Sequence, residues 1–545
     1  MKAVISSRST EDVRTVGLVD TPFAVLFLIV AVVITAPLAV IDTPLLADYP
    51  NHVARMHVLG NLDDNILLSE RYAVTFDLIP NIAMDFAVPR LARWMSLDLA
   101  GRIFLGACLV LSLASVAFLH RILFNQWYSY SLLAAFFVYH GSMMVGMANF
   151  SLGIGLVPGA LALWIRMLEA HVAWRLLVGC MMTLLLYFCH LVAVGAFGIL
   201  IIGHGLAHLR DYAGHSDGLR RTFREFSVIA ATGLLPLVLF LSILQAGDRA
   251  SAPGEIVYGN LAWKLKALLS PLANYHLPLD LISFALLLIL GLALWWRGWL
   301  VIDRRLQPGL ALLAAAFVVA PKALWTGGLF DQRLAVLLAL MLVASTHVKV
   351  APGRIVHTLS VVLALLFLVR MSVLTSTWLE HRDDLAEMHR AIDLMSEGGR
   401  ILVVQPDEDA GQRLAPPRHR VLHHAVQLVS LPALAVVETS AFVSSLYAIQ
   451  GQQPLALKPP YDRLGGRGHV DLPTLDDLAL ALRSDQADTA TRRQIQTWTN
   501  DFDYIVMIYG YGPNRDARVD DLPIDMLLDG AILDLFRVVK NRRLP

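Results

Sequence analysis

Apolar runs long enough to cross a membrane recur along most of this chain. The first, 22–41, carries no charged side chain, and a bilayer core takes about 20 such residues. The 545-residue chain is 56% hydrophobic and only 16% charged, whereas soluble globular domains have about 25% charged residues. The sequence therefore predicts a multi-pass α-helical membrane protein.

Further apolar runs bring the expected number of transmembrane helices to about 11. They lie at about 101–120, 129–148, 151–168, 174–190, 191–209, 226–245, 279–297, 307–322, 333–348 and 354–376. Basic and acidic residues are balanced at 44 each. The chain therefore lacks the excess of positive charge that would indicate a nucleic-acid partner.

The basic connections predict the orientation of these spans. Cytoplasmic loops are enriched in Lys and Arg, and the basic loops alternate with the others if the 1–21 tail is cytoplasmic. Those loops lie near 120–121, 166–175, 210–224, 297–305 and 349–354. The connections near 149, 190, 247–277 and 322–333 then face outward, as does the C-terminus. Arg90, Arg93 and Arg102 are the exception, because they fall on the outer side.

We divide the chain into a cytoplasmic tail, 1–21, a transmembrane domain, 22–376, and a C-terminal domain, 377–545. The transmembrane domain includes an outer loop, 42–100, in which we expect two interfacial helices. After 376 the long apolar runs cease and charge becomes frequent. Alternating helical and strand-like segments predict a soluble α/β domain there. Its expected strands are 400–404, 433–437 and 504–508, and its expected helices are 384–395 and 476–482.

The outer loop opens with the polar cluster Asp48-Tyr49-Pro50-Asn51-His52, shortly after the first span ends. Ionisable groups near lipid are expensive and usually functional. Asp48 is therefore the leading candidate for a catalytic residue. The alternative is that Asp48 caps a helix begun by Pro50, and one residue could do both.

With these features the chain resembles the GT-C glycosyltransferases, which are integral membrane enzymes that use polyprenyl-phosphate sugars. The resemblance rests on the layout, on the Asp48 cluster, on Leu78-Ile-Pro-Asn81 and on Asp331-Gln-Arg333 before a late span. It implies an outward-facing site in which the carboxylate of Asp48 is the catalytic residue. Members often carry a second acid beside the first. Tyr49 stands there in this chain, so the sequence does not indicate a metal-binding acid pair.

A sugar joined to a lipid phosphate already has a good leaving group, so the reaction needs a base and cations rather than a general acid. Asp48 could take the proton of the acceptor hydroxyl and invert the anomeric centre. His52 follows one helical turn later and could orient the acceptor or bind phosphate. Tyr49, Asn51 and Arg55 are further substrate-binding candidates from the same segment.

Four other residues are candidates for contacting the substrate. Lys322 and Arg333 bracket an outer loop at headgroup depth, where Arg333 could grip the donor phosphate. Either could instead extend to the interface, and Asp331 could pair with Arg333. His190 lies at an outward turn. It could be a substrate ligand or a structural histidine whose hydrogen bonds are satisfied within the protein. Trp263 could stack on a sugar or serve as an interfacial anchor.

The remaining signals are weak. His419, His423 and His424 have the spacing of a helical metal pair but no clear acid partner, so they are a poor zinc signal. The sequence establishes no cofactor; a divalent metal ion is an open alternative that no motif indicates, and the acceptor could be a lipid, a glycan or a protein. The expected location is a bacterial inner membrane with the C-terminal domain in the periplasm.

The main alternative function is a transporter or flippase of a lipid-linked or amphipathic substrate, and a third is a catalytically silent assembly protein.

Overall fold

The computed structural model describes residues 21–213, 216–246, 256–324, 327–350, 353–405, 428–449, 451–466, 472–483, 494–508 and 522–540. In these ranges eight helices are long and apolar enough to cross a membrane. They are α1 (Thr21–Thr35, extended by a 3-10 turn, Ala36–Ala39), α5 (Leu97–Phe124), α7 (Ala148–Arg166), α8 (Val172–Cys189), α9 (Leu191–Ala213), α10 (Gly218–Ala246), α12 (Leu277–Trp296) and α15 (Arg354–Asp393). Each coincides with an expected span.

The other three expected spans take different forms. Two are shorter helices, α13 (Gln307–Val319) and α14 (Phe330–Ser345). The prediction of one continuous span over 129–148 was wrong, because that segment forms a 3-10 helix, η2 (Ser129–Phe137), and one turn of helix, α6 (Gly141–Met144). Most of this segment is buried within the protein, where irregular backbone can find hydrogen-bond partners that lipid does not offer.

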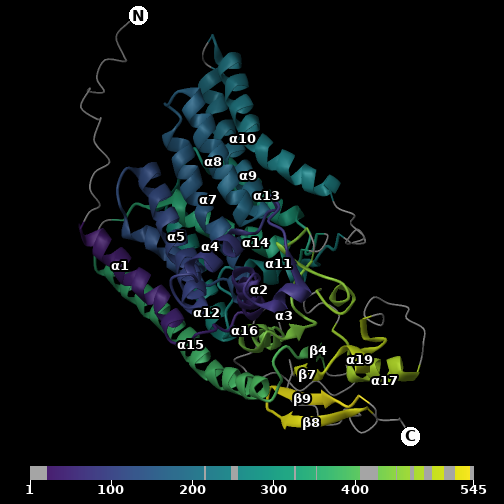
Figure 1. The fold of residues 1–545 in the computed structure, drawn as a ribbon. Helices are drawn as coiled ribbons and strands as arrows, with labels where there is room; N and C mark the ends of the chain where they lie inside the picture. The colour runs from purple at the N-terminus through teal and green to yellow at the C-terminus, as the bar shows by residue number, and fades with distance from the viewer. Residues whose placement is uncertain are drawn as a thin grey trace, which may run out of the picture.

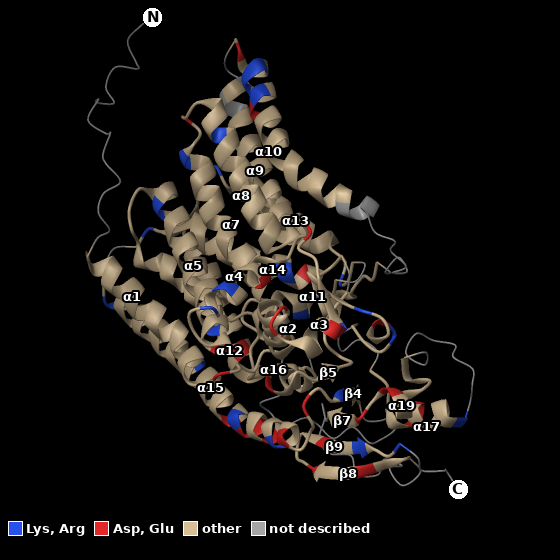
Figure 2. Cartoon of the chain, viewed as in Figure 1, with Lys and Arg blue, Asp and Glu red and all other residues tan. Residues whose placement is uncertain are grey.

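The connections sort into two ends of the helical bundle. At one end β2 (Leu300–Ile302) pairs antiparallel with β3 (Thr346–Val348), and the His120 ring lies 3.0 Å from the Thr346 carbonyl oxygen. These segments belong to the connections near 120–121, 297–305 and 349–354, which the charge pattern predicts to be cytoplasmic. Lys and Arg also gather where α9 ends and α10 begins, at the end of the bundle away from the C-terminal sheet (Figure 2).

At the other end the connections expected to face outward meet one another. The Asp48 amide donates to the Val145 carbonyl at 2.9 Å, and the Ile82 amide donates to the Phe188 carbonyl at 2.9 Å. The outer loop lies here as α2 (Tyr49–Asn61), α3 (Ile66–Arg71) and α4 (Ala83–Leu91). At nine residues, α4 is about 14 Å long and too short to span a bilayer, in agreement with an interfacial helix.

Helix α15 joins the bundle to the C-terminal domain (Figure 1). Its 40 residues extend about 60 Å, roughly twice the thickness of a bilayer core. The first half is apolar and largely exposed, as expected of a lipid-facing surface, whereas the second half is charged and carries buried residues such as His381 and Met388. The expected helix at 384–395 is the end of this single long element.

The C-terminal domain is built on a mixed sheet of five strands among the described residues, in the order β5-β4-β7-β9-β8. Strand β4 pairs parallel with β5 and β7, while β9 pairs antiparallel with β7 and β8. The strands are β4 (Arg400–Val404), β5 (Phe442–Val443), β7 (Tyr504–Ile508), β8 (Ile524–Asp529) and β9 (Leu533–Val538), with helices α16 (Leu434–Thr439), α17 (Leu475–Arg483) and α19 (Trp498–Asp501). The predicted strands at 400–404 and 504–508 and the helix at 476–482 are confirmed, but the strand expected at 433–437 is helical.

The C-terminal domain is docked directly onto the outer loop. Strand β1 (Tyr72–Val74) of the loop pairs antiparallel with β6 (Leu455–Leu457) of the domain. The buried Arg71 guanidinium donates to the carbonyl oxygens of Ser440 and Gly398 at 2.6 and 2.5 Å. These bonds fix the domain next to α2, whose first residues carry the candidate site.

Charged residues inside the bundle are paired with one another. Arg370 on α15 donates to Asp280 on α12 at 2.8 Å, and each side chain is only 2% exposed. Arg175 on α8 pairs with Glu225 on α10 and stacks over the Trp164 ring. Buried charges that have partners are expected to serve the packing of the helices.

Candidate active site

The backbone holds Asp48 at the start of α2 through a glycine in the neighbouring segment. Gly146 has a φ of +95°, a conformation that side chains other than glycine rarely adopt. A Cβ atom built on Gly146 would lie 2.9 Å from the Asp48 amide nitrogen and 3.1 Å from the Asp48 Cβ. Gly146 therefore allows the two chain segments to approach closely enough for the Asp48 amide to bond to the Val145 carbonyl.

The Asp48 side chain does not cap the helix that it precedes. Asp48 occupies the N-cap position of α2, yet its carboxylate accepts no capping hydrogen bond from the first turn. Burial raises the pKa of Asp48 to about 7, although the guanidinium groups of Arg55 and Arg333 both act to lower it. A carboxylate with such a pKa exchanges its proton near neutral pH, as a general base requires.

His52 and Arg55 follow Asp48 along α2. The Arg55 guanidinium binds Asp85 of α4 with nitrogen–oxygen distances of 2.6 and 3.2 Å, and both side chains are buried. It also lies 3.0 Å from Nδ1 of His52. Burial and Arg55 lower the pKa of His52 to about 3, while a hydrogen bond to the Gly146 backbone acts in the opposite direction. His52 is therefore neutral near pH 7, and Arg55 supplies positive charge while held by Asp85.

Tyr49 and Asn51 point into packing contacts. The Tyr49 hydroxyl lies against Gly101 of α5, where an added Cβ would be only 2.2 Å from it. The Asn51 amide donates to Ser430 at 2.8 Å and accepts from the Tyr447 amide at 3.3 Å. Asn51 thus ties α2 to the C-terminal domain, and Tyr49 ties α2 to α5.

His190 and Arg333 come together although 143 positions separate them. Nη1 of Arg333, at the start of α14, lies 3.1 Å from Nε2 of His190, at the junction of α8 and α9. Both side chains pack on the ring of Phe150 from the first turn of α7, each at 5.3 Å from the ring centroid. The charge of Arg333 also lowers the pKa of Asp48, which places this pair in the same site.

Lys322, in the connection between α13 and α14, and Trp263, on α11 (Leu261–Leu268), lie in a second polar cluster. The Trp263 indole donates to Asp331 at 3.1 Å, and Nζ of Lys264 lies 3.0 Å from the same carboxylate. Nζ of Lys322 lies 4.3 Å from the centroid of the Trp263 ring. Asp331 is therefore engaged by Trp263 and Lys264, and the alternative that it pairs with Arg333 is wrong.

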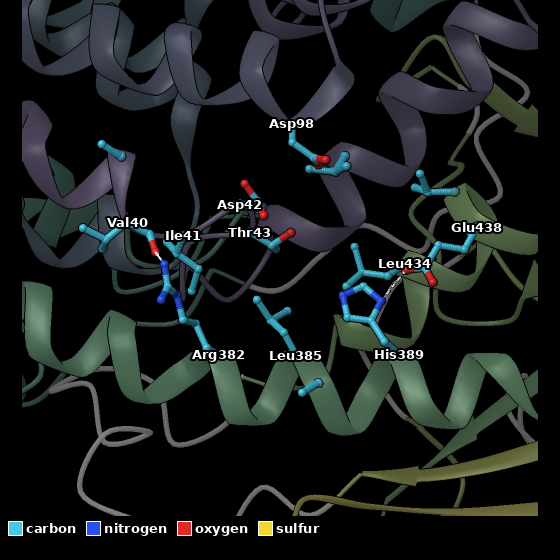
Figure 3. Close-up of a pocket in the computed structure, with 14 residues that line it drawn as sticks. Val40, Ile41, Asp42, Thr43, Asp98, Arg382, Leu385, His389, Leu434 and Glu438 are labelled. Atoms are coloured by element: carbon cyan, nitrogen blue, oxygen red, sulfur yellow. Dashed lines mark hydrogen bonds and ion pairs between the residues drawn. The ribbon is translucent and has the colours of Figure 1, made fainter.

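A cavity of about 580 Å³ lies beside another face of α2. Val53 contributes to its wall and follows Asp48 by five residues, which on an α-helix is about 140° around the axis. Figure 3 shows Asp42 and Asp98 at this cavity, with a dashed contact between His389 and Glu438 that measures 2.8 Å. Asp48 is not one of its lining residues, so the cavity is separate from the candidate active site.

The described residues contain no group of three or more His, Cys, Asp or Glu side chains placed to hold a metal ion. His419, His423 and His424 lie outside the described residues, as does the N-terminal tail.

Sequence reasoning missed three residues of the site. Asp85 anchors Arg55, Phe150 supports His190 and Arg333, and Gly146 admits Asp48. Gly146 left a weak signal, since it falls near the end of the expected span 129–148, and a glycine there can mark a turn or a close approach. Nothing in the spacing of Asp85 or Phe150 distinguishes them from ordinary helix residues.

No protein-family model matches the chain, and no curated protein matches its sequence. Two solved structures of ArnT from Cupriavidus metallidurans have a similar fold. The one bound to undecaprenyl phosphate has a TM-score of 0.52 at 12% identity, and the apo state has 0.52 at 13% identity. Each match covers 95% of this chain and 98% of the other chain. Over almost its whole length the chain therefore has the fold of these structures, and the expected polytopic helical membrane domain followed by a C-terminal domain is confirmed.

Proposed function

We propose that this protein is a membrane glycosyltransferase that moves a sugar from a polyprenyl-phosphate donor to an acceptor hydroxyl at the outer face of the membrane. The observation that carries the proposal is a buried carboxylate, Asp48, within reach of the charges of Arg55 and Arg333. The fold supports it, because a structure with this fold is bound to undecaprenyl phosphate.

Asp48 acts as the general base. Its carboxylate takes the proton of the acceptor hydroxyl while the acceptor oxygen bonds to the anomeric carbon of the donor sugar. The bond between that carbon and the phosphate oxygen breaks, and the phosphate leaves with the electron pair. The products are the glycosylated acceptor, protonated Asp48 and a polyprenyl phosphate. Direct displacement of this kind inverts the anomeric centre.

Arg333 stabilises the departing phosphate. Its side chain is 8% exposed, and a charge–charge interaction gains strength when water is excluded. Arg55 contributes at longer range, because its guanidinium is bound by Asp85. Lys322 lies in the connection between α13 and α14 and Trp263 lies on α11, where they can line the path of the incoming sugar.

The difference in charge between the two ends of the helical bundle supports a site at the outer face. The Asp48 site and the C-terminal domain share one end, and the basic connections lie toward the other (Figure 2). Cytoplasmic loops are the basic ones, so this charge distribution supports a site facing the periplasm of a bacterial inner membrane. The C-terminal domain then covers the outer loop from the periplasmic side.

The test uses purified protein in liposomes that contain undecaprenyl-phosphate sugars labelled in the sugar, together with a lipid and glycan extract as the acceptor source. We expect label to move covalently to an acceptor while undecaprenyl phosphate accumulates in equal amount. Movement of intact labelled donor between the leaflets, without release of undecaprenyl phosphate, would instead support a flippase. Absence of both activities with the whole set of donors would contradict the proposal.

A further inference from the structure

The inference concerns the protonation state of His190 and rests on the proposed function. His190 follows the last residue of α8 and precedes α9, so its side chain occupies the N-cap position of α9. The Val192 amide donates to Nδ1 of His190 at 3.1 Å, which satisfies one of the free amides of the first turn. Nδ1 must therefore carry a lone pair rather than a proton.

A neutral imidazole with a lone pair on Nδ1 carries its proton on Nε2. The tautomer follows from the hydrogen-bond network. A doubly protonated ring is excluded by the same bond from Val192, and it would also place two positive charges side by side in a largely buried site. Nε2–H of His190 is thus a hydrogen-bond donor.

Nε2 of His190 faces another donor. Nη1 of Arg333 lies 3.1 Å from it, and an arginine guanidinium has no acceptor atom. Two N–H groups in this position cannot bond to each other. Nε of Arg333 is also buried and has no hydrogen-bond partner in the described part of the chain. Several donors therefore converge where the hydrogen bonds of the described residues supply no matching acceptor.

We propose that His190 and Arg333 form a paired donor site for one phosphate group of the lipid donor, with His190 acting as a neutral N–H donor. A phosphate oxygen accepts from Nε2 of His190 and from Nη1 of Arg333 at the same time. Phe150 packs beneath both groups and keeps them directed to one point. When the phosphate leaves the sugar, both bonds strengthen as its negative charge grows.

Binding of the phosphate must open the pair. Two nitrogen donors that each lie about 2.8 Å from one oxygen are separated by about 4 to 5 Å. The distance between Nε2 of His190 and Nη1 of Arg333 should therefore increase from the present 3.1 Å when undecaprenyl phosphate is bound.

Two substitutions separate the capping role of His190 from its donor role. In His190→Asn the side-chain oxygen of the asparagine can accept from the Val192 backbone N–H as Nδ1 does, but the asparagine has no group at the Nε2 position. In His190→Gln the longer amide can place an N–H near the Nε2 position, but the cap is lost. We expect the Asn variant to keep its thermal stability and to bind undecaprenyl phosphate about tenfold more weakly.

The Gln variant should show the opposite pattern, a lower melting temperature with undecaprenyl phosphate affinity close to that of the wild type. Affinity is measured in nanodiscs against undecaprenol, the uncharged analogue, which neither substitution should affect. Unchanged phosphate affinity in the Asn variant would overturn the inference, as would a loss of affinity in the Gln variant equal to that in the Asn variant. A wild-type protein that does not bind undecaprenyl phosphate would contradict the proposed function itself.

Discussion

Lowering the pH should abolish the proposed transferase activity in a range where an ordinary aspartate would remain ionised. Burial raises the pKa of Asp48 to about 7, and only the ionised carboxylate can accept a proton. Half of the sites are then ionised at pH 7, about one in ten at pH 6 and about one in a hundred at pH 5. We expect kcat/KM to fall about fivefold from pH 7 to pH 6 and about fiftyfold from pH 7 to pH 5.

The assay measures initial rates of undecaprenyl phosphate release at low donor concentration from pH 5 to pH 9, because kcat/KM reports the free enzyme. His52 cannot produce this inflection, since its pKa is lowered to about 3. The pKa of His389 is raised by Glu438, so this histidine could also titrate in the measured range. His389→Gln should leave the profile unchanged. A profile that stays flat from pH 5 to pH 8 in folded protein would refute the reasoning.

The same shift predicts an effect on stability. A carboxyl group whose pKa is higher in the folded state than in the unfolded state contributes stability at low pH, and that contribution is lost as the pH rises through about 7. Asparagine resembles the protonated form and does not ionise. Asp48→Asn should therefore raise the melting temperature at pH 8 and have much less effect at pH 4. An equal change at both pH values would contradict this assignment of the pKa.

Three further substitutions test the framework of the site. Gly146→Ala should reduce kcat strongly in a folded protein, because the new Cβ would meet Asp48 at about 3 Å; activity measured with circular dichroism checks this. Arg55→Ala should destabilise the protein by about 3–5 kcal/mol, because it leaves Asp85 buried and unpaired, and the double variant Arg55→Ala with Asp85→Ala should recover part of that loss in thermal unfolding. Arg333→Lys should raise KM for the donor about tenfold, since lysine lacks the planar fork that binds phosphate, and steady-state kinetics at several donor concentrations measures it.

The elements that could be predicted are those that one local pattern decides. The segments 400–404 and 504–508 are short, continuous apolar runs, and both are central strands of the sheet with parallel neighbours, where both faces are covered. The run at 433–437 has the same composition but is helical. Its Pro432 precedes the helix and suits a helical first turn, yet so short an apolar run does not distinguish a strand from a buried helix.

The segment 129–148 shows why hydropathy alone misjudged one span. Its composition is that of a transmembrane helix, but its backbone is irregular and mostly buried among α5, α14 and α1. Hydropathy measures how well a segment tolerates an apolar environment, whether lipid or protein supplies it. The irregular backbone also has a role, because it brings the Val145 carbonyl to the Asp48 amide.

Within the site, the sequence singled out Asp48 as the candidate base but could not identify the contacts around it. Asp48 could be recognised because a charged residue so near a span needs a reason. The meeting of His190 with Arg333 depends on how α8, α9 and α14 pack, which no spacing encodes. Asp331 and Arg333 are two positions apart, and residues with this spacing point to different sides of a helix. Asp331 accordingly reaches Trp263, while Arg333 turns toward His190.

The most direct measurement compares wild-type protein with Asp48→Asn in single-turnover release of undecaprenyl phosphate from a labelled donor sugar. Because the two side chains have nearly the same shape, donor binding should be retained. We predict that the Asn variant binds the donor with wild-type affinity but releases undecaprenyl phosphate at least a hundredfold more slowly, as expected when a general base is removed. Equal release rates for the two proteins would show that the Asp48 carboxylate is not the base.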